Sequence, residues 1–315
     1  MTQSSGVPLS GERLPIGALQ PVSRRYSFVY LDRCVVHRDA NAVVAMSDTG
    51  TTYLPAASFG VLLLGPGTRV THQAMNLLGE SGVVTCWVGE GGARLYASAP
   101  SLSRSTHLLE AQARLVSRRT SRLAVARQMY QMRFPGEEVQ HATMQQLRGM
   151  EGARVRRAYK QLATEHGLEW KGRHYDPDDW AAGDPLNKAL STANSVLYGI
   201  VHTVIVATGC SPGLGFVHTG HILSFVYDMA DLYKVEISLP AAFEMVAAGT
   251  EDLASRVRRT VRERSYEARI LQRAVDDIHL LLGASEEEVV EDAYLALWDE
   301  EVGLVKPGTA YGPAT

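Results

Sequence analysis

The chain changes character once along its length, and this change constrains its fold more than any other feature. Before residue 98, short segments rich in Val, Tyr and Leu alternate with Asp, Asn, Gly and Pro turn signals. After residue 105, helical spacing takes over, and the run "HLLEAQARLVSRRTSRLAVARQMYQMRF" extends for 28 residues without Gly or Pro. Short strands followed by long helices predict an α+β, two-domain chain in which the two kinds of structure are segregated.

The boundaries of the two domains follow from the same change. We expect an N-terminal β-rich domain over residues 1–98, with one embedded helix at "THQAMNLLGES". Residues 99–105 have the composition of a linker, and residues 106–302 are expected to form an all-α domain. Residues 303–315 are expected to be a disordered tail. A chain of 315 residues has room for two cores of ordinary size.

Cysteine usage and the distribution of apolar residues exclude several protein classes. The three cysteines are scattered without a CxxC pair, which argues against a disulfide framework or a zinc knuckle and fits a reducing cytoplasm. The N-terminus shows no secretion signal. The apolar run at 195–210 is short for a membrane span, so we interpret it as a buried core helix and expect no membrane partner.

Charge is separated into blocks, although the net charge is only −3. Between Arg104 and Arg173 there are fourteen Lys/Arg against six Asp/Glu, and "SRVRRTVRERSYEARILQR" is a second basic cluster. By contrast, "SEEEVVEDAYLALWDEEVG" has eight acids and no base. Such blocks indicate a basic face that binds a polyanion, or ordinary solvated helix faces with ion pairs.

The segment "GFVHTGHILSFVYDMADLYK" places Asp228 and Asp231 in an apolar run. A buried carboxylate needs a basic side chain, a shared proton or a metal ion. On a helix, residues three apart lie on one face, and His218 could reach the same cation; one imidazole favours Mn²⁺ while still admitting Mg²⁺. The spacing also fits a cap or ion pair with a core histidine, and His221 could replace His218, contact phosphate or lie on the surface.

A third carboxylate is available in "LRGMEGARVRRAYKQLA", which contains Glu151 between several arginines. Glu151 is either a salt-bridged helix residue or a metal ligand surrounded by arginines that hold a negatively charged backbone. The residue pattern alone leaves both interpretations open.

Three long motifs make the chain resemble a known family. "LRGMEGARVRRAYKQLA", "GRHYDPDDWAAGDPLNKALSTANSVLYG" and "GFVHTG…LSFVYDMADLYK" occur in the order and spacing of the CRISPR-associated adaptation integrase, in its type I-E form. The resemblance covers roughly residues 20 to 280 and includes "LLLGPGTRVTHQAM" and "CWVGEGGARLYAS".

The resemblance implies a fold, a metal site and a reaction. The N-terminal domain would be β-sandwich-like and the C-terminal domain helical. Glu151, His218 and Asp228 would bind Mg²⁺ or Mn²⁺, with Asp231 as an adjacent catalytic carboxylate. The 3′-hydroxyl of a captured DNA fragment would attack a phosphodiester at the edge of the CRISPR repeat, and with water as nucleophile the same site would act as an endonuclease.

The resemblance also implies DNA contacts from both domains. The matching arginines are Arg69, Arg94, Arg148, Arg156, Arg258 and Arg262. Tyr175 and Tyr198 fall in the region that resembles the pocket for the DNA end, although core or interface tyrosines would look the same. Two positions depart from the family: His221 stands where a Lys is usual, and Arg33 where an aromatic residue can stand.

The implied partners are double-stranded DNA, a second copy of the chain joined through the β-rich domains, and a small ferredoxin-like protein. The acidic C-terminal segment could contact that partner or regulate the protein. Two other functions remain as alternatives: a stand-alone metal-dependent nuclease in DNA repair, and a catalytically silent DNA-binding scaffold.

Overall fold

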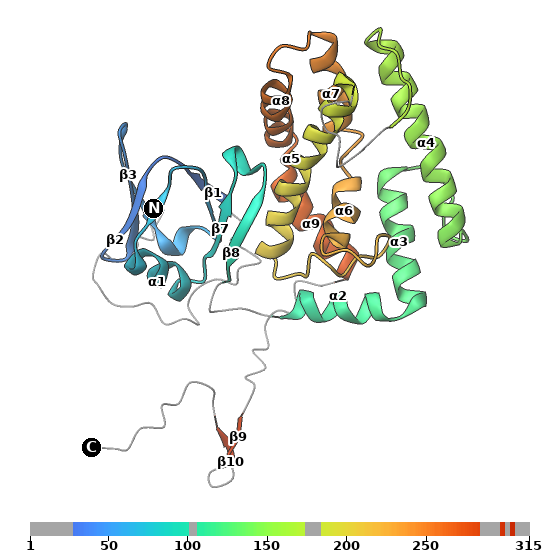
Figure 1. Ribbon diagram of the computed structural model, residues 1–315. Coiled ribbons are helices and arrows are strands. Elements are labelled where there is room, and N and C mark those ends of the chain that lie inside the picture. Colours follow the sequence, from blue (N-terminus) through green and yellow to red (C-terminus); the bar gives the residue numbers. More distant parts are fainter. Residues whose placement is uncertain (1–27, 101–105, 174–183, 284–296, 300–302, 306–315) are drawn as a thin grey trace, which may run out of the picture.

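The computed structural model describes residues 28–100, 106–173, 184–283, 297–299 and 303–305. A β-rich region lies beside a helical region, with the strands β7 and β8 facing the helix α5 (Figure 1). As predicted, the N-terminal region is mostly strands, β1 to β8, and the helices α2 to α9 follow from His107.

Two four-stranded sheets form the N-terminal region. One has the order β1-β5-β7-β8, and its strands are β1 (Phe28–Leu31), β5 (Val61–Leu64), β7 (Val84–Val88) and β8 (Leu95–Ala99). The other has the order β4-β3-β2-β6, and its strands are β2 (Val35–Asp39), β3 (Ala42–Ser47), β4 (Gly50–Pro55) and β6 (Arg69–Val70). In the first sheet β1, β5 and β7 run parallel and β8 antiparallel.

The two sheets share one core with the helix α1 (His72–Glu80). Val36 and Val43 come from one sheet, Leu62 and Leu64 from the other, and Leu78 from α1; all are at most 1% exposed. This arrangement agrees with the expected β-sandwich-like core. The short strand β6, which follows the "GPG" turn, was not predicted.

The helical region consists largely of helices that the sequence predicted. These are α2 (His107–Ser117), α3 (Arg119–Arg133), α4 (Met144–Glu165), α5 (Pro185–Ala207), α6 (Ser224–Asp231), α7 (Ser238–Ala247), α8 (Leu253–Glu267) and α9 (Ile270–Leu282). The helix α5 packs against α6, α7, α8 and α9 and lies at the centre of the largest apolar core.

The predicted 28-residue helix is broken into α2 and α3 at Arg118. Arg118 is extended, with φ −103° and ψ 126°. The hydroxyl of Ser121 donates to the carbonyl of Arg118 at 3.1 Å, and Arg122 Nε donates to the distant carbonyl of Phe216 at 2.8 Å. Serine side chains that bond to backbone compete with helical bonds, so the break needs neither Gly nor Pro.

Two expectations about the C-terminus need correction. The strands β9 (Leu297–Asp299) and β10 (Gly303–Val305) pair antiparallel, so residues 106–302 are not entirely helical and residues 303–305 do not belong to a disordered tail. The physical reason is local: each of the two paired segments contains two consecutive apolar residues, "LW" and "LV". The rest of the acidic segment and of the tail lies outside the described residues, as does most of the linker.

The β-rich region packs against the helix α5. The outer face of the first sheet packs on Val206 and Ala207 of α5. Further along, Gly199 lies against the segment after the 3₁₀ helix η4 (Glu90–Gly92), where an added Cβ would come within 2.4 Å of the Ala93 carbonyl. Glycine is required there for close packing.

The helix α5 is also the one helix in the described chain that is long and apolar enough to cross a membrane. However, 67% of its most apolar stretch is buried inside the protein. Its packing against four other helices is that of a core helix, as the sequence predicted for its C-terminal half.

Candidate active site

Asp228 anchors the segment that contains His218. Its Oδ2 accepts hydrogen bonds from the backbone amides of Phe216 (2.5 Å) and Val217 (3.0 Å), and its Oδ1 accepts one from the amide of His218 (2.9 Å). The side chain of Asp228 is 0% exposed. These bonds fix the turn at residues 216–218 to the helix α6.

The fourth contact of Asp228 orients the imidazole of His218. The Nδ1 atom of His218 lies 2.7 Å from Asp228 Oδ1, while 44% of the His218 side chain is exposed. This hydrogen bond raises the pKa of His218, and burial lowers it only in part. Because Nδ1 is held by the carboxylate, Nε2 is the ring nitrogen that can bind a ligand.

Asp231, the last residue of α6, faces two cations. Its Oδ1 lies 2.5 Å from Lys234 Nζ, and its Oδ2 lies 3.7 Å from Arg133 Nη1. Burial alone would raise the pKa of Asp231, but Lys234 and Arg133 outweigh it and the pKa is lowered. The same pair raises the pKa of Lys234 against the effect of its burial. Asp231 is therefore ionised and Lys234 protonated at neutral pH.

Glu151 extends from α4 toward the same place. Its Oε2 accepts a hydrogen bond from the hydroxyl of Tyr130 at 2.6 Å, and its Oε1 is 2.6 Å from Arg133 Nη1. Burial and the bond to Glu151 raise the pKa of Tyr130, so this hydroxyl remains a donor. Arg133 thus lies between Glu151 and Asp231.

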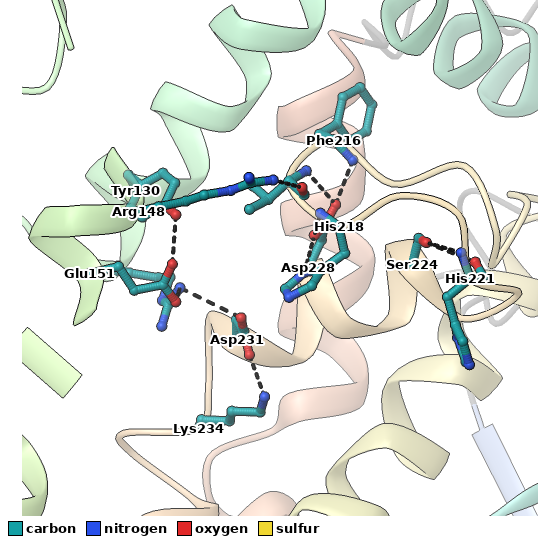
Figure 2. Close-up of polar contacts among 12 residues, drawn as sticks. Tyr130, Arg148, Glu151, Phe216, His218, His221, Ser224, Asp228, Asp231 and Lys234 are labelled. Atoms are coloured by element: carbon teal, nitrogen blue, oxygen red, sulfur yellow. Dashed lines mark hydrogen bonds and ion pairs between the residues drawn. The ribbon is translucent and has the colours of Figure 1, made fainter. Parts of the chain in front are cut away.

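Figure 2 shows Glu151 and Asp231 facing one another, with His218 lying beside Asp228. Within the described residues, no three His, Cys, Asp or Glu side chains are close enough to form a metal-binding cluster. Neither the predicted set of Glu151, His218 and Asp228 nor the set in which Asp231 replaces Asp228 is therefore assembled around a common point. The reason is that the carboxylates already have partners in the protein.

The two aspartates have different environments. A carboxylate has about four acceptor positions, and the contacts of Asp228 fill them without leaving one for a metal ion. One oxygen of Asp231 is directed at Arg133, whose guanidinium provides the positive charge between Asp231 and Glu151. Two carboxylates and one imidazole are suitable ligands for Mg²⁺ or Mn²⁺, so Glu151, His218 and Asp231 fit such an ion.

A pocket of about 500 Å³ opens beside these residues. Arg133, Glu151 and Asp231 line one part of it, and Lys234 and Arg173 line another. Its lining combines polar and apolar side chains, and three of its five charged side chains are cations. It can accept an anionic ligand whose reacting atom lies next to the two carboxylates.

Aromatic side chains border the pocket. Tyr198 and Tyr227 meet edge to face with ring centroids 5.0 Å apart, and Lys234 Nζ lies 4.9 Å from the Tyr198 ring centroid. His221 packs on the other side of Tyr227 at 5.2 Å, and its Nδ1 accepts a hydrogen bond from the amide of Leu223. Tyr198 thus lines this pocket, while His221 is an exposed surface residue near it.

The arginines that were predicted to contact DNA have diverse environments. The exposed ones are Arg69, Arg94, Arg148, Arg156 and Arg258. Among them Arg148 also donates to the carbonyl of Val217 at 3.0 Å, beside His218. Arg262 is instead partly buried and donates to the carbonyl of Glu90 at 3.2 Å, so it connects α8 to the β-rich region. Tyr175 lies outside the described residues.

Sequence reasoning missed five residues of the site: Tyr130, Arg133, Arg173, Tyr227 and Lys234. Lys234 follows Asp231 by three residues, a spacing that is typical of an ion pair and could have indicated it. Tyr130 and Arg133 lie on α3, 21 and 18 residues before Glu151, and no periodicity connects them to α4.

Comparison with known proteins gives a consistent result. A family model described as "CRISPR associated protein Cas1" matches residues 28–138 and 131–254. A CRISPR-associated endonuclease Cas1 from Clostridium sp. (strain SY8519) is 48% identical over 292 residues, which cover 92% of this chain and 97% of the relative. The corresponding protein of Escherichia coli (strain K12) is 39% identical over 275 residues, or 87% of this chain and 90% of the relative.

Solved structures show the same likeness. The crystal structure of a TtCas1–DNA complex has 46% sequence identity and a TM-score of 0.78, with 83% of this chain and 98% of that chain covered. A casposase bound to its integration product has a TM-score of 0.59 at 14% identity, over 83% of this chain and 96% of that chain. The second match shows a shared fold.

Proposed function

Because the chain belongs to the Cas1 family of CRISPR-associated proteins, we propose that it is a metal-dependent DNA endonuclease and integrase of CRISPR adaptation. The observation that carries the proposal is the pair Glu151 and Asp231 with His218 beside it, at a pocket lined by Lys234 and Arg173. Relatives named as endonucleases and a relative solved with DNA support the same function.

The reaction is a transesterification at phosphorus. The 3′-hydroxyl of a captured DNA fragment gives up its proton, and its oxygen forms a new P–O bond to a phosphodiester of the CRISPR repeat. The bond from that phosphorus to the leaving 3′-oxygen breaks, and this oxygen takes up a proton. Bonds are conserved in number, so no ATP is needed. With water as the attacking group, the same site cleaves DNA.

Glu151, Asp231 and Nε2 of His218 would hold Mg²⁺ or Mn²⁺. When bound, the ion supplies Lewis-acid stabilisation of the phosphoryl and leaving oxygens. Asp228 keeps the His218 ring in the tautomer with its proton on Nδ1, through the contact at 2.7 Å. Asp228 is thus proposed as the positioning residue of His218 and Asp231 as the direct ligand, in place of the reverse assignment.

The remaining residues of the pocket bind and orient the DNA. Lys234 is held protonated by Asp231 and offers positive charge to a phosphate. Tyr198 and Tyr227 provide ring faces and edges on which an unpaired base can pack. The exposed arginines of both regions add sequence-independent contacts to the DNA backbone.

The proposed context is that of the type I-E subfamily. The chain would act in the cytoplasm as a homodimer joined through its β-rich regions, with a small ferredoxin-like partner, double-stranded prespacer DNA and the CRISPR repeat. The burial of α5 supports the absence of a membrane partner.

The test is a joining assay with the full chain, with and without the small partner. A short duplex and a supercoiled plasmid that carries the repeat are incubated in Mn²⁺, and covalent joining is measured. We expect joining that requires metal and the partner and is abolished by EDTA and by Asp231→Asn. The Asp231→Asn protein should still bind DNA, because the exposed arginines are intact.

The alternatives give different results in the same assay. Metal-dependent degradation without joining, unaffected by the partner, would indicate a stand-alone nuclease. DNA binding without either reaction would indicate a scaffold. Joining by Asp231→Asn at the wild-type rate would contradict the role of Asp231.

A further inference from the structure

We propose that Arg133 is an internal counter-cation that occupies the position of the divalent ion between Glu151 and Asp231 and is displaced when the ion binds. This inference rests on the metal site of the proposed function. It adds a residue that controls how tightly that site binds metal.

The contacts of Arg133 place one nitrogen between two carboxylates. Its Nη1 is 2.6 Å from Glu151 Oε1 and 3.7 Å from Asp231 Oδ2, and its side chain is 8% exposed. Two acidic side chains that face each other in a buried place need a positive charge between them. In the protein alone, Arg133 provides that charge.

The other oxygen of each carboxylate has its own partner. Glu151 Oε2 accepts from Tyr130, and Asp231 Oδ1 pairs with Lys234. Each carboxylate is therefore held in place independently of Arg133. The two oxygens that face Arg133 can transfer to a metal ion without reorientation of either side chain.

Arg133 is also bound less completely than a structural arginine. Its Nε is buried without a hydrogen-bond partner, and its contact to Asp231 is longer than a hydrogen bond. By comparison, Arg273 binds Glu236 through two nitrogens, at 2.8 and 3.0 Å. A bidentate pair is strong and geometrically fixed, whereas the arrangement of Arg133 leaves bonding capacity unused.

A divalent ion and the guanidinium cannot share the same two oxygens. Like charges a few ångströms apart in a partly buried site repel strongly. Arg133 also lines the pocket, which gives a displaced guanidinium space beside the position where the DNA phosphate would lie. Metal binding would then add a positive charge to the DNA-binding part of the pocket.

The test measures Mn²⁺ affinity of the full chain without DNA, by calorimetry and by the electron paramagnetic resonance signal of free Mn²⁺. Arg133→Gln should tighten binding about tenfold, a size typical of groups just outside a ligand set. Tyr130→Phe should weaken it, because Glu151 loses the donor that orients it. Each of the two variants removes one partner of Glu151, and the two are expected to change the Mn²⁺ affinity in opposite directions.

A matched control is Arg154→Gln. Arg154 is similarly buried, with 11% of its side chain exposed, and its guanidinium lies over the same Phe134 ring as that of Arg133, but it pairs with Glu137 outside the site. The Mn²⁺ affinity of the Arg154→Gln protein should equal that of the wild type. An equal gain in Arg154→Gln would show a general charge effect and overturn the inference.

The remaining outcomes separate the inference from the proposed function. Unchanged or weaker Mn²⁺ binding in Arg133→Gln, with a wild type that binds, would overturn the role of Arg133 and leave the metal site standing. Absence of Mn²⁺ binding in every variant would overturn both. If Arg133→Gln folds poorly in EDTA, Arg133→Met replaces it; methionine is also uncharged, so the Mn²⁺ affinity of the Arg133→Met protein should likewise lie above that of the wild type.

Discussion

At the scale of single residues, Asp228 shows how a carboxylate is kept inside an apolar segment. Its partners are three backbone amides and one imidazole, and no arginine or lysine is among these four contacts. Backbone amides at a tight turn neutralise an anion with fixed dipoles and hold it in one orientation. The motif "GFVHTG" thus supplies the backbone amides that bind Asp228 as well as the side chain of His218.

We predict that Asp228→Ala lowers the free energy of unfolding by about 2 to 4 kcal/mol, because several buried donors lose their acceptor. The measurement is urea unfolding in EDTA, which removes any effect of metal. Ser195→Ala is the control, since its hydroxyl bonds within its own helix to the carbonyl of Ser191. Equal stability of Asp228→Ala and the wild type would show that the turn at 216–218 does not depend on this carboxylate.

At the scale of elements, local sequence predicted most strands and helices but not the places where long-range contacts decide. Alternating Val and Leu gave the strands, and the capping box of Thr143 with Gln146 marks the start of α4. Beside the break at Arg118, Arg122 bonds to Phe216, 94 residues away, a contact that no local pattern contains. For the same reason the motifs predicted Glu151 and His218 as site residues but not Arg133, which contacts Glu151 only because α3 packs beside α4.

The start of α5 gives a prediction about pH. The carboxylate of Asp184 accepts bonds from the amides of Leu186 and Asn187, both at 3.0 Å. Burial would raise the pKa of Asp184, but these bonds and the Asn187 side chain outweigh it and lower the pKa from 3.8. The stability it contributes is therefore present above 3.8 and is lost as the pH falls through the lower folded-state pKa.

Asp184→Ala should cost about 1 kcal/mol of unfolding free energy at neutral pH, as is usual for loss of an N-cap. The difference from the wild type should shrink as the pH falls below 3.8. Chemical denaturation from neutral pH to that range measures it. Asp184→Asn retains an oxygen acceptor, so it should keep most of the stability and lose the pH dependence; a constant difference for Asp184→Ala at every pH would contradict the charged cap.

At the scale of the whole molecule, α5 joins the two regions as well as organising the helical core. The first sheet packs on Val206 and Ala207, and the backbone at Ala93 touches Gly199. Arg262 adds a bond from α8 to Glu90. These contacts put the β-rich region in a fixed place on the helix that also carries Tyr198 of the pocket.

Gly199→Ala is predicted to destabilise the protein by about 1 to 3 kcal/mol, because the new methyl group would overpack against backbone that cannot turn away. Gly149→Ala is the matched control: Gly149 lies in α4 with no atom within 4 Å of an added Cβ. That change should stabilise by up to about 1 kcal/mol through helix propensity. Thermal unfolding measures both, and equal effects of the two substitutions would contradict the close packing at Gly199.

Tyr198 and Gly199 are consecutive residues of α5, one at the wall of the pocket and the next beneath the β-rich region. A well-packed helix has no hinge between neighbouring positions. A force applied to the β-rich region therefore reaches the pocket as a rigid-body movement, without amplification or delay by a flexible joint. In mechanical terms, one rigid helix both supports the β-rich region and lines the pocket.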